Sequence, residues 1–303
     1  MCDTADIDAL WVRDHLPAPD REPRLEAWTA LTLATMTVKR ARMGATLIPA
    51  FRPVGVLAAM AGTLDVASGG RLELTLSTEW SQEEHGRVSL ALADDDSVAT
   101  PLKSYARDLR TLLAGESIAP GDMTKLGVAS PQPGGPRISI EVTTPEQVEV
   151  AATIADDVVL RAGLLTSLSE AVSGIREVCG RIDRDPASLG ISLEVPVSIG
   201  RTRAEAEARA AGETLFDVVG HPARVGIFGT LEECQERVIA FAHAGVSDLR
   251  CIIPNNPDIH DVIAQLTAIA IGSVDILAPG TPRSRHPDPP ETWGGRQPRP
   301  AIG

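Results

Sequence analysis

Short runs of apolar, often β-branched residues recur along the chain and alternate with longer segments of helical periodicity. Continuous apolar runs of this length are typical of strands in a parallel sheet that is covered on both faces. We expect seven strands, at Ala9–Val12, Arg42–Ile48, Leu72–Leu76, Ile138–Val142, Val158–Leu160, Ile191–Val197 and Leu249–Ile253.

The segments between these runs have the spacing of amphipathic helices. Pro23–Thr37, for example, places Leu25, Trp28, Leu31 and Ala34 three residues apart, which forms one apolar stripe. A threonine followed three residues later by glutamate, as in Thr230–Glu233, has the spacing of a capping box. The pattern predicts helices at Pro23–Thr37, Pro53–Ala67, Leu102–Leu113, Pro145–Ala155, Ser167–Arg181, Arg203–Gly212, Leu231–Ala244 and His260–Ile271.

This alternation of strands and helices predicts an α/β fold, either a TIM (β/α)8-type barrel or a doubly wound sheet. The strand count favours the barrel, which needs eight strands to close. We expect one barrel domain over residues 1–280, with an excursion at about residues 77–136 that is longer than a normal crossover. The Pro-, Gly- and Arg-rich segment 281–303 has no periodicity and is expected to form an extended or disordered tail.

Composition and charge exclude several classes of function. The 303 residues include 28 basic and 41 acidic side chains, a formal net charge of −13, which disfavours binding to nucleic acid or to an anionic membrane surface. No apolar run is long enough to span a bilayer. The four cysteines are scattered without metal-ligand spacing, so we expect reduced thiols in a cytoplasmic protein and no metal site.

Candidate catalytic residues lie where predicted strands end, because parallel barrels carry their active sites at the carboxyl ends of the strands. The first strand leads into Asp14 and His15, an imidazole that can act as an acid or base with Asp14 to orient it, or can be structural. Trp80 follows the third strand and can wall a flat ligand or cover the core. Thr143 and Thr144 open a helix, where amides and hydroxyls suit a phosphate or form an ordinary N-cap.

Several segments, in order along the chain, resemble the bacterial luciferase-like flavin and deazaflavin oxidoreductases. The strongest match is Leu64–Leu74, which reads LDVASGGRLEL and resembles the family's "LD-x-x-S-G-G-R-x-x-L-G" signature. The weaker matches are Asp8–His15, Leu25–Ala30, Thr37–Gly44, Ala155–Asp156, Gly226–Glu233 and Ala244–Val246.

The resemblance implies a TIM barrel that binds FMN or a deazaflavin (coenzyme F-420) at its carboxyl face and performs hydride transfer or monooxygenation on a small organic substrate. WVRDH at Trp11–His15 resembles the deazaflavin members slightly more. By the same resemblance His15 is the proton donor, Thr46 and Leu47 occupy a position that often carries a non-prolyl cis peptide behind the ring, and Thr143 and Thr144 bind the cofactor phosphate. A homodimer is also expected.

The sequence departs from the family in two places that bear on function. The family's first strand and helix are missing ahead of Asp8, which predicts an open seam with an unpaired strand edge. Its glycine-rich segment reads LTLSTEW at Leu74–Trp80, where added side chains narrow the space for a ligand. These departures support an alternative function, a divergent barrel that acts as a binding protein or non-redox catalyst.

Overall fold

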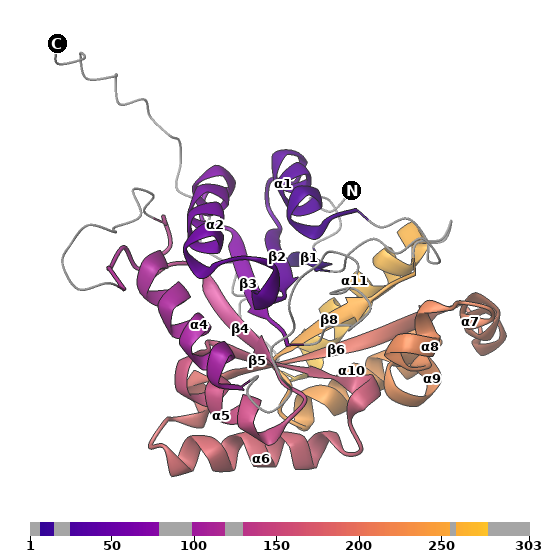
Figure 1. The fold of residues 1–303 in the computed structure, drawn as a ribbon. Helices are drawn as coiled ribbons and strands as arrows, with labels where there is room; N and C mark the ends of the chain where they lie inside the picture. Colours follow the sequence, from indigo (N-terminus) through magenta and orange to yellow (C-terminus); the bar gives the residue numbers. More distant parts are fainter. Residues whose placement is uncertain (1–6, 15–24, 79–98, 119–129, 255–258, 278–303) are drawn as a thin grey trace.

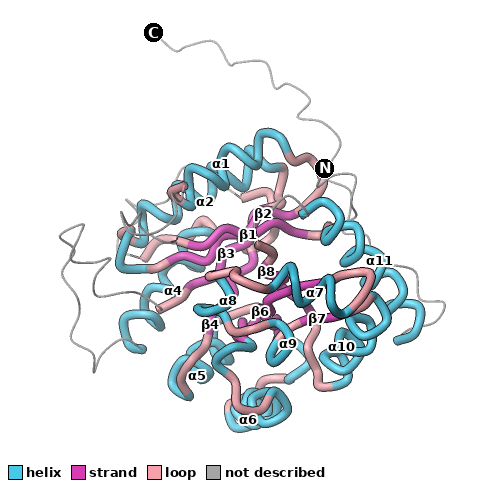
Figure 2. The backbone as a smooth tube through the Cα atoms, turned by 90° about the vertical axis from the view of Figure 1, so that its right-hand side faces the viewer, coloured by secondary structure: helices cyan, strands magenta, loops and turns pink. Residues whose placement is uncertain are grey.

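The fold comes from a computed structural model that describes residues 7–14, 25–78, 99–118, 130–254 and 259–277. The strands lie at the centre and the helices surround them (Figures 1 and 2). The strands are β1 (Ala9–Arg13), β2 (Arg42–Leu47), β3 (Leu72–Leu76), β4 (Arg137–Glu141), β5 (Asp157–Arg161), β6 (Gly190–Ile199), β7 (Ile227–Gly229) and β8 (Asp248–Ile252).

The α-helices follow the strands in the βα order expected of a barrel. They are α1 (Ala27–Thr37), α2 (Val54–Ser68), α4 (Ala99–Leu113), α5 (Pro145–Ile154), α6 (Leu168–Arg181), α7 (Arg203–Ala210), α8 (Leu215–Val219), α9 (Pro222–Val225), α10 (Leu231–His243) and α11 (Ile259–Leu277). All seven predicted strands and all eight predicted helices are present. Sequence reasoning missed the three-residue β7 and the short helices α8 and α9, because elements this short leave little periodicity.

Local capping explains where several helices begin and end. The predicted start of α1 at Pro23 is wrong, because the Glu26 carboxylate accepts hydrogen bonds from the Trp28 and Thr29 amides and caps the helix there. The capping box predicted at Thr230 is confirmed, with reciprocal hydrogen bonds between Thr230 and Glu233.

All strand pairs are parallel, and the sheet is a nearly closed barrel with one open seam. The strands follow the order β1 to β7, while β8 pairs with Ser192–Pro196 of β6 and β7 pairs with Val197–Ile199 of the same strand. Among the described residues β1 pairs only with β2 and β8 only with β6. The expected seam therefore lies between β1 and β8, and both strands are largely half-buried whereas β3 and β5 are fully buried.

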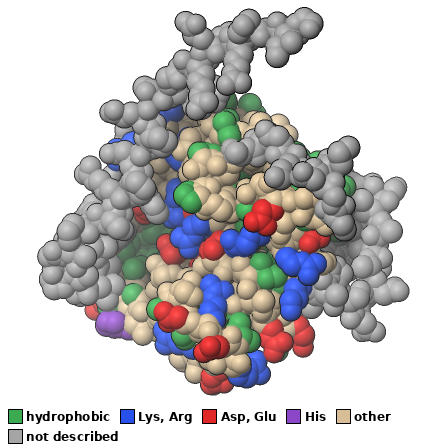
Figure 3. Space-filling model, turned by 90° about the vertical axis from the view of Figure 1, so that its left-hand side faces the viewer, with side chains coloured by type: hydrophobic (Ala, Val, Ile, Leu, Met, Phe, Trp, Pro, Cys, Tyr) green, Lys and Arg blue, Asp and Glu red, His purple; other side chains and the backbone are tan. Residues whose placement is uncertain are grey.

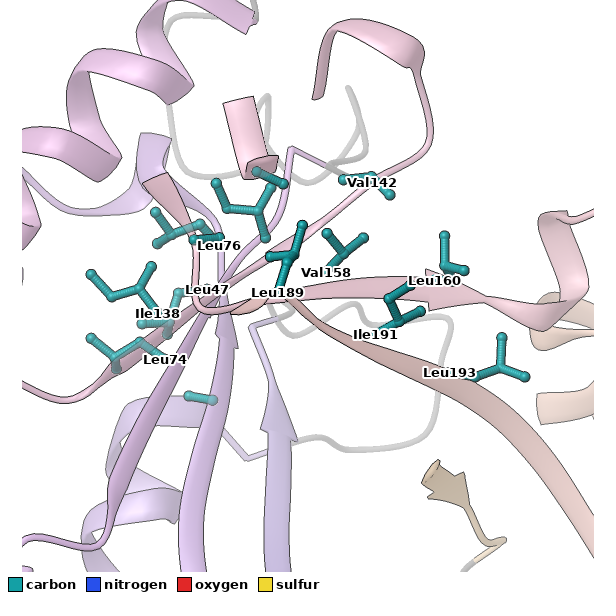
Figure 4. Close-up of a cluster of buried hydrophobic side chains, with 14 of the residues drawn as sticks. Leu47, Leu74, Leu76, Ile138, Val142, Val158, Leu160, Leu189, Ile191 and Leu193 are labelled. Carbon is teal, nitrogen blue, oxygen red and sulfur yellow. The ribbon is translucent and has the colours of Figure 1, made fainter. Parts of the chain in front are cut away.

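The two faces of the sheet differ in chemistry, which the sequence analysis did not anticipate. The face toward the helices is apolar, and Figure 4 shows part of this core, including Leu74, Leu76, Ile138 and Val158. The alternate positions carry polar side chains that are also buried: Thr75, Ser77, Ser139, Glu141, Asp157, Ser192 and others. Several of them bond to strands that are not neighbours, as Thr75, Ser139 and Asp157 do with Arg250 of β8, so they line the barrel interior.

Parts of the expected excursion and the tail lie outside the described residues. Within the excursion the structure describes α4, which packs against α2 and α5 and so serves as the crossover helix between β3 and β4. Residues 281–303 are not described. None of the described helices combines the length and the apolarity needed to cross a membrane.

Candidate functional site

A cluster of charged side chains fills the barrel interior at the carboxyl ends of the strands. We call Arg13, Ser77, Glu141, Arg161 and Glu194 the mouth cluster. Arg13, the last residue of β1, donates hydrogen bonds to Glu141 at the end of β4 and, over 3.2 Å, to Glu194 on β6. The Ser77 hydroxyl donates to Glu141 Oε1 over 2.8 Å, and Arg161 lies 3.6 Å from Glu194. Four strands, and the residue that follows β3, thus contribute to one polar group.

The carboxyl group of Glu141 is among the most deeply buried members of the mouth cluster. Its side chain is 1% exposed, whereas that of Arg13 is 23% exposed and is the member nearest to solvent. Burial raises the pKa of Glu141 above its ordinary value, and the nearby charge of Glu194 adds to this, while Arg13, Arg161 and Ser77 oppose it.

A second buried ion pair lies deeper in the barrel, and we call it the core pair. Arg250 of β8 lies 3.4 Å from the Asp157 carboxylate and donates to the Thr75 hydroxyl over 2.7 Å. Burial raises the pKa of Asp157 to about 6 and lowers that of Arg250. The Arg250 guanidinium also stacks on the Trp11 ring, 3.6 Å from its centroid.

This stacking joins the two edge strands across the seam, because Trp11 belongs to β1 and Arg250 to β8. The Trp11 ring lies directly over Gly44, and a Cβ atom at Gly44 would overlap with the ring. Side chains therefore bridge the seam where the described residues form no backbone ladder.

At the start of α5, three donors converge on a single oxygen atom. The Thr143 amide, the Thr143 hydroxyl and the Thr144 amide point to Gln147 Oε1, at 2.6, 3.0 and 3.1 Å. Gln147 is buried, and its amide nitrogen donates to the Thr78 hydroxyl, next to Ser77 of the mouth cluster. We call Thr143, Thr144 and Gln147 the cradle. Its donors are of the kind that binds a phosphate oxygen, so the residues fit a cofactor phosphate if Gln147 moves aside.

An open hollow of about 500 Å³ lies at the carboxyl ends of β6 and β7. Its lining includes both Arg201 and the carboxylates of Glu232 and Asp261, so it has no single charge character. Of the residues predicted for catalysis or cofactor binding, none that the structure describes lines it. On the molecular face in Figure 3, cationic and anionic side chains are likewise intermixed.

A profile of the luciferase-like monooxygenase family matches residues 2–223. The chain belongs to this family. Members are oxidoreductase enzymes, so this luciferase-like protein is an enzyme of that class.

Solved structures show the same fold at low sequence identity. The coenzyme F-420-dependent tetrahydromethanopterin reductase from Methanopyrus kandleri superposes with a TM-score of 0.71 at 18% identity, covering 89% of this chain and 92% of that one. An F-420-dependent secondary alcohol dehydrogenase gives 0.74 at 14%, covering 90% and 92%. A monooxygenase from Streptomyces bottropensis gives 0.72 at 17%, covering 90% and 89%. These enzymes confirm the TIM-type barrel for this luciferase-like chain.

The family's strongest motif forms a structural turn at the opposite, amino end of the barrel. We call residues 65–71 the signature turn. Gly69 and Gly70 end α2 with φ angles of 73° and 82°, which favour glycine. Arg71 then donates to the carbonyl oxygens of Ser68, Ala41 and Val38. The motif therefore identifies the fold and lies away from the mouth.

The predicted site residues are only partly described. His15 and Trp80 lie outside the described residues. Thr46 and Leu47 are buried at the end of β2. Every described peptide bond is trans, so the cis peptide expected at this position is absent. Both residues instead continue the regular pairing of β2 with β3.

Asp14 has well-defined partners among the described residues. Its carboxylate accepts hydrogen bonds from the Ile48 amide and from Arg52, which also contacts Glu26. Its own amide donates to the Thr46 carbonyl oxygen over 2.8 Å. Asp14 thus fixes the end of β1, immediately before His15.

Sequence reasoning missed Glu141, Arg161 and Glu194. Each stands in a strand beside apolar residues, as in Ile138–Val142 and Ile191–Val197. A charged residue at an alternate position of a strand that is buried on both faces must point into the barrel. The sequence therefore indicated that these charged side chains point inward. It did not indicate which of them meet across the barrel.

Proposed function

We propose that this protein is a flavin- or deazaflavin-dependent oxidoreductase that acts on a small organic substrate at the carboxyl face of its barrel. Family membership supports the reaction class. The single structural observation that supports the cofactor is the cradle, where three donors meet at one oxygen position beside the mouth. When bound, FMN or coenzyme F-420 would supply hydride or oxygen-transfer chemistry, and we favour the deazaflavin.

The proposal gives this chain's own residues the following roles. Thr143 and Thr144 hold the phosphate, while Thr46, Leu47 and Trp80 contact the ring. His15 is the proton donor, and Asp14, anchored by Arg52 and Ile48, fixes the strand end from which the His15 segment departs.

Binding of each cofactor to the purified protein, followed by absorbance and fluorescence, tests this function. Thr143→Ala removes one donor from the cradle and is expected to weaken FMN binding about 10-fold, the effect of one hydrogen bond to a charged group. Riboflavin has no phosphate, so its affinity should not change. Thr153→Ala is a matched control, since this exposed threonine of α5 donates only to the Glu149 carbonyl oxygen in its own helix.

Gln147→Ala should act in the opposite direction to Thr143→Ala. It removes the side chain that occupies the donors, so FMN is expected to bind more tightly than in the unmodified protein. If neither cofactor binds to protein that circular dichroism shows to be folded, the oxidoreductase proposal fails. The charged mouth would then favour the alternative, a non-redox barrel or binding protein.

We further propose that the enzyme is a cytoplasmic homodimer. The three described cysteines are free thiols, as a reducing compartment would keep them. Leu33 and Met36 on α1 are 62% and 66% exposed, which gives the helix that follows edge strand β1 an apolar outer face. Sedimentation of the unmodified protein and of Leu33→Glu tests this, because the substitution should yield monomer if α1 forms the contact.

A further inference from the structure

The open hollow at the carboxyl ends of β6 and β7 is a cavity for which the proposed function has no use. Its volume of about 500 Å³ is typical of sites that bind small molecules. Three segments line it: the residues that follow β6, the start of α10 and the first part of α11. The barrel fold therefore brings distant parts of the chain together around one space.

The backbone that borders the hollow is fixed by two close approaches that require glycine. The Gly200 amide donates to the Gly229 carbonyl oxygen over 3.0 Å and so joins the ends of β6 and β7. A Cβ atom at Gly200 would overlap with Ala206 N and with the Thr202 carbonyl oxygen. Gly229 has a φ angle of 115°, and a Cβ atom there would overlap with the Glu233 carboxylate. The border of the hollow is therefore preorganised, which lowers the entropic cost of binding a ligand.

Several charged side chains around the hollow already have partners. Glu233 pairs with Arg203 over 2.8 Å. Arg209 pairs with Glu205 over 2.9 Å and with Asp261 over 2.8 Å, and thereby connects α7 to α11. These ion pairs hold the surrounding elements together and leave their charges neutralised.

The lining of the hollow also has one cation and one anion that are not neutralised. Arg201 and Glu232 are exposed, and within the described part of the chain neither forms an ion pair. The Thr230 hydroxyl accepts an amide of α10, so its own proton remains available to a ligand. Gln265 donates through its side-chain nitrogen within α11, so its carbonyl oxygen remains available as an acceptor. Leu231, 44% exposed, adds an apolar surface.

These groups match the two charged ends of an amino acid. A carboxylate accepts hydrogen bonds from a guanidinium and from a hydroxyl, which Arg201 and Thr230 provide. An ammonium group donates to a carboxylate and to a carbonyl oxygen, which Glu232 and Gln265 provide. A ligand with only an anionic group would be repelled by Glu232, and a ligand with only a cationic group would be repelled by Arg201.

We propose that the hollow binds an α-amino acid with an apolar side chain. The carboxylate of this ligand lies at Arg201 and Thr230, its ammonium group at Glu232 and Gln265, and its side chain against Leu231. The hollow shares no described residue with the cradle or the mouth cluster, so this binding site is additional to the proposed function.

Calorimetric titration of the cofactor-free protein with L-leucine, L-methionine and L-phenylalanine tests this proposal. At least one of them should bind with a Kd below about 1 mM, because two charge-assisted contacts form in an open site. If none of the three binds, the proposal is overturned.

Analogues that lack one charge test whether both ends of the ligand are recognised. For L-leucine these are 4-methylpentanoate, without the ammonium group, and 3-methylbutylamine, without the carboxylate. Each should bind at least about 10-fold more weakly than the amino acid, the effect of one hydrogen-bonded charge. If the acid binds as tightly as the amino acid, the hollow is a general anion site, and if the amine does, it is a cation site. Either result overturns the proposal.

Single variants of the two unpaired charges locate each end of the ligand. Arg201→Gln should weaken amino-acid binding about 10-fold without weakening that of the amine. Glu232→Gln should weaken amino-acid binding to a similar extent without weakening that of the acid. Both side chains are exposed, so the variants are expected to fold, which circular dichroism verifies. The matched control is Glu236→Gln, an exposed glutamate of α10 outside the hollow, which should change nothing. Amino-acid binding that neither Arg201→Gln nor Glu232→Gln weakens overturns the proposal.

This proposal and the proposed function fail independently. Arg201→Gln and Glu232→Gln should bind FMN or coenzyme F-420 as the unmodified protein does, because neither residue belongs to the cradle or the mouth cluster. A protein that binds the amino acid but neither cofactor refutes the proposed function and keeps this inference. A protein that binds a cofactor but none of the amino acids keeps the proposed function and loses only this inference.

Discussion

The signature turn and the barrel interior are both rich in buried polar side chains, but these side chains have different kinds of hydrogen-bond and ion-pair partners in the two regions. In the signature turn, Arg71 donates to three main-chain carbonyl oxygens, and the Asp65 carboxylate accepts the Leu72 amide over 3.1 Å. In the interior, charged side chains mostly bind one another: Arg13 with Glu141 and Glu194, and Arg250 with Asp157.

This difference separates the part of the molecule that defines the fold from the part that can support chemistry. Most hydrogen bonds of the signature turn are made to main-chain carbonyl and amide groups, which do not titrate, although the Asp65 carboxylate also accepts from the Ser130 hydroxyl and the Gln132 side-chain amide. Ion pairs between side chains can gain or lose a proton, and each buried charge depends on its partner. We therefore expect loss of a side chain to lower the free energy of unfolding most in the signature turn. In the barrel interior we expect the free energy of unfolding to depend on pH.

The largest expected effect is in the signature turn. Arg71→Met removes the donor from three buried carbonyl oxygens at once and should lower the free energy of unfolding by about 3–5 kcal/mol. Denaturant unfolding measures this. The control is Arg107→Met, because Arg107 is 67% exposed and pairs only with the adjacent Asp108, and its loss should cost less than about 0.5 kcal/mol. Equal losses in the two variants would refute the assignment of Arg71 as the centre of the turn.

The core pair should show strong coupling between its two members. Arg250→Met leaves the buried Asp157 carboxylate without its cation and should cost about 3 kcal/mol at pH 8. Adding Asp157→Asn removes the buried charge, so the double variant should be more stable than Arg250→Met alone. A double-mutant cycle by denaturant unfolding measures the coupling. If the losses of stability in the two single variants simply add up in the double variant, Arg250 and Asp157 do not stabilise each other.

Asp157 should also make stability depend on pH, in a direction opposite to that of an ordinary salt-bridged aspartate. Its pKa is about 6 in the folded protein and about 4 in the unfolded chain, so the folded state binds the proton more tightly. The stability it contributes is fully present below about pH 4 and is lost as pH rises through about 6, by at most about 3 kcal/mol. The free energy of unfolding of Asp157→Asn should fall less than that of the unmodified protein between pH 4 and pH 7. Parallel pH curves would contradict the assignment.

The contrast between the two regions also explains what the sequence could predict. The residues of the signature turn lie within seven positions, and its glycines, serine and arginine are typical of a helix end followed by a strand. The hydrogen bonds from Arg71 to Ala41 and Val38, 30 and 33 positions away, were not predicted. The mouth cluster joins residues 128 and 181 positions apart, Arg13 with Glu141 and with Glu194. Seven of the eight described strands were predictable from apolar runs, whereas contacts across the barrel depend on strand register, which periodicity does not determine.

The smallest expected effect lies at the cradle, which combines features of both regions. Thr144 caps α5 by accepting the Gln147 amide, and the Gln147 side chain accepts the Thr144 amide in return. Thr144→Ala should therefore destabilise the protein by only about 1 kcal/mol, as loss of an N-cap does. If the cradle also binds phosphate, saturating FMN should stabilise the unmodified protein more than Thr144→Ala, by a difference that riboflavin does not reproduce. Thermal unfolding with each ligand separates the two roles, since a purely structural cap would give the same ligand-induced stabilisation in both proteins.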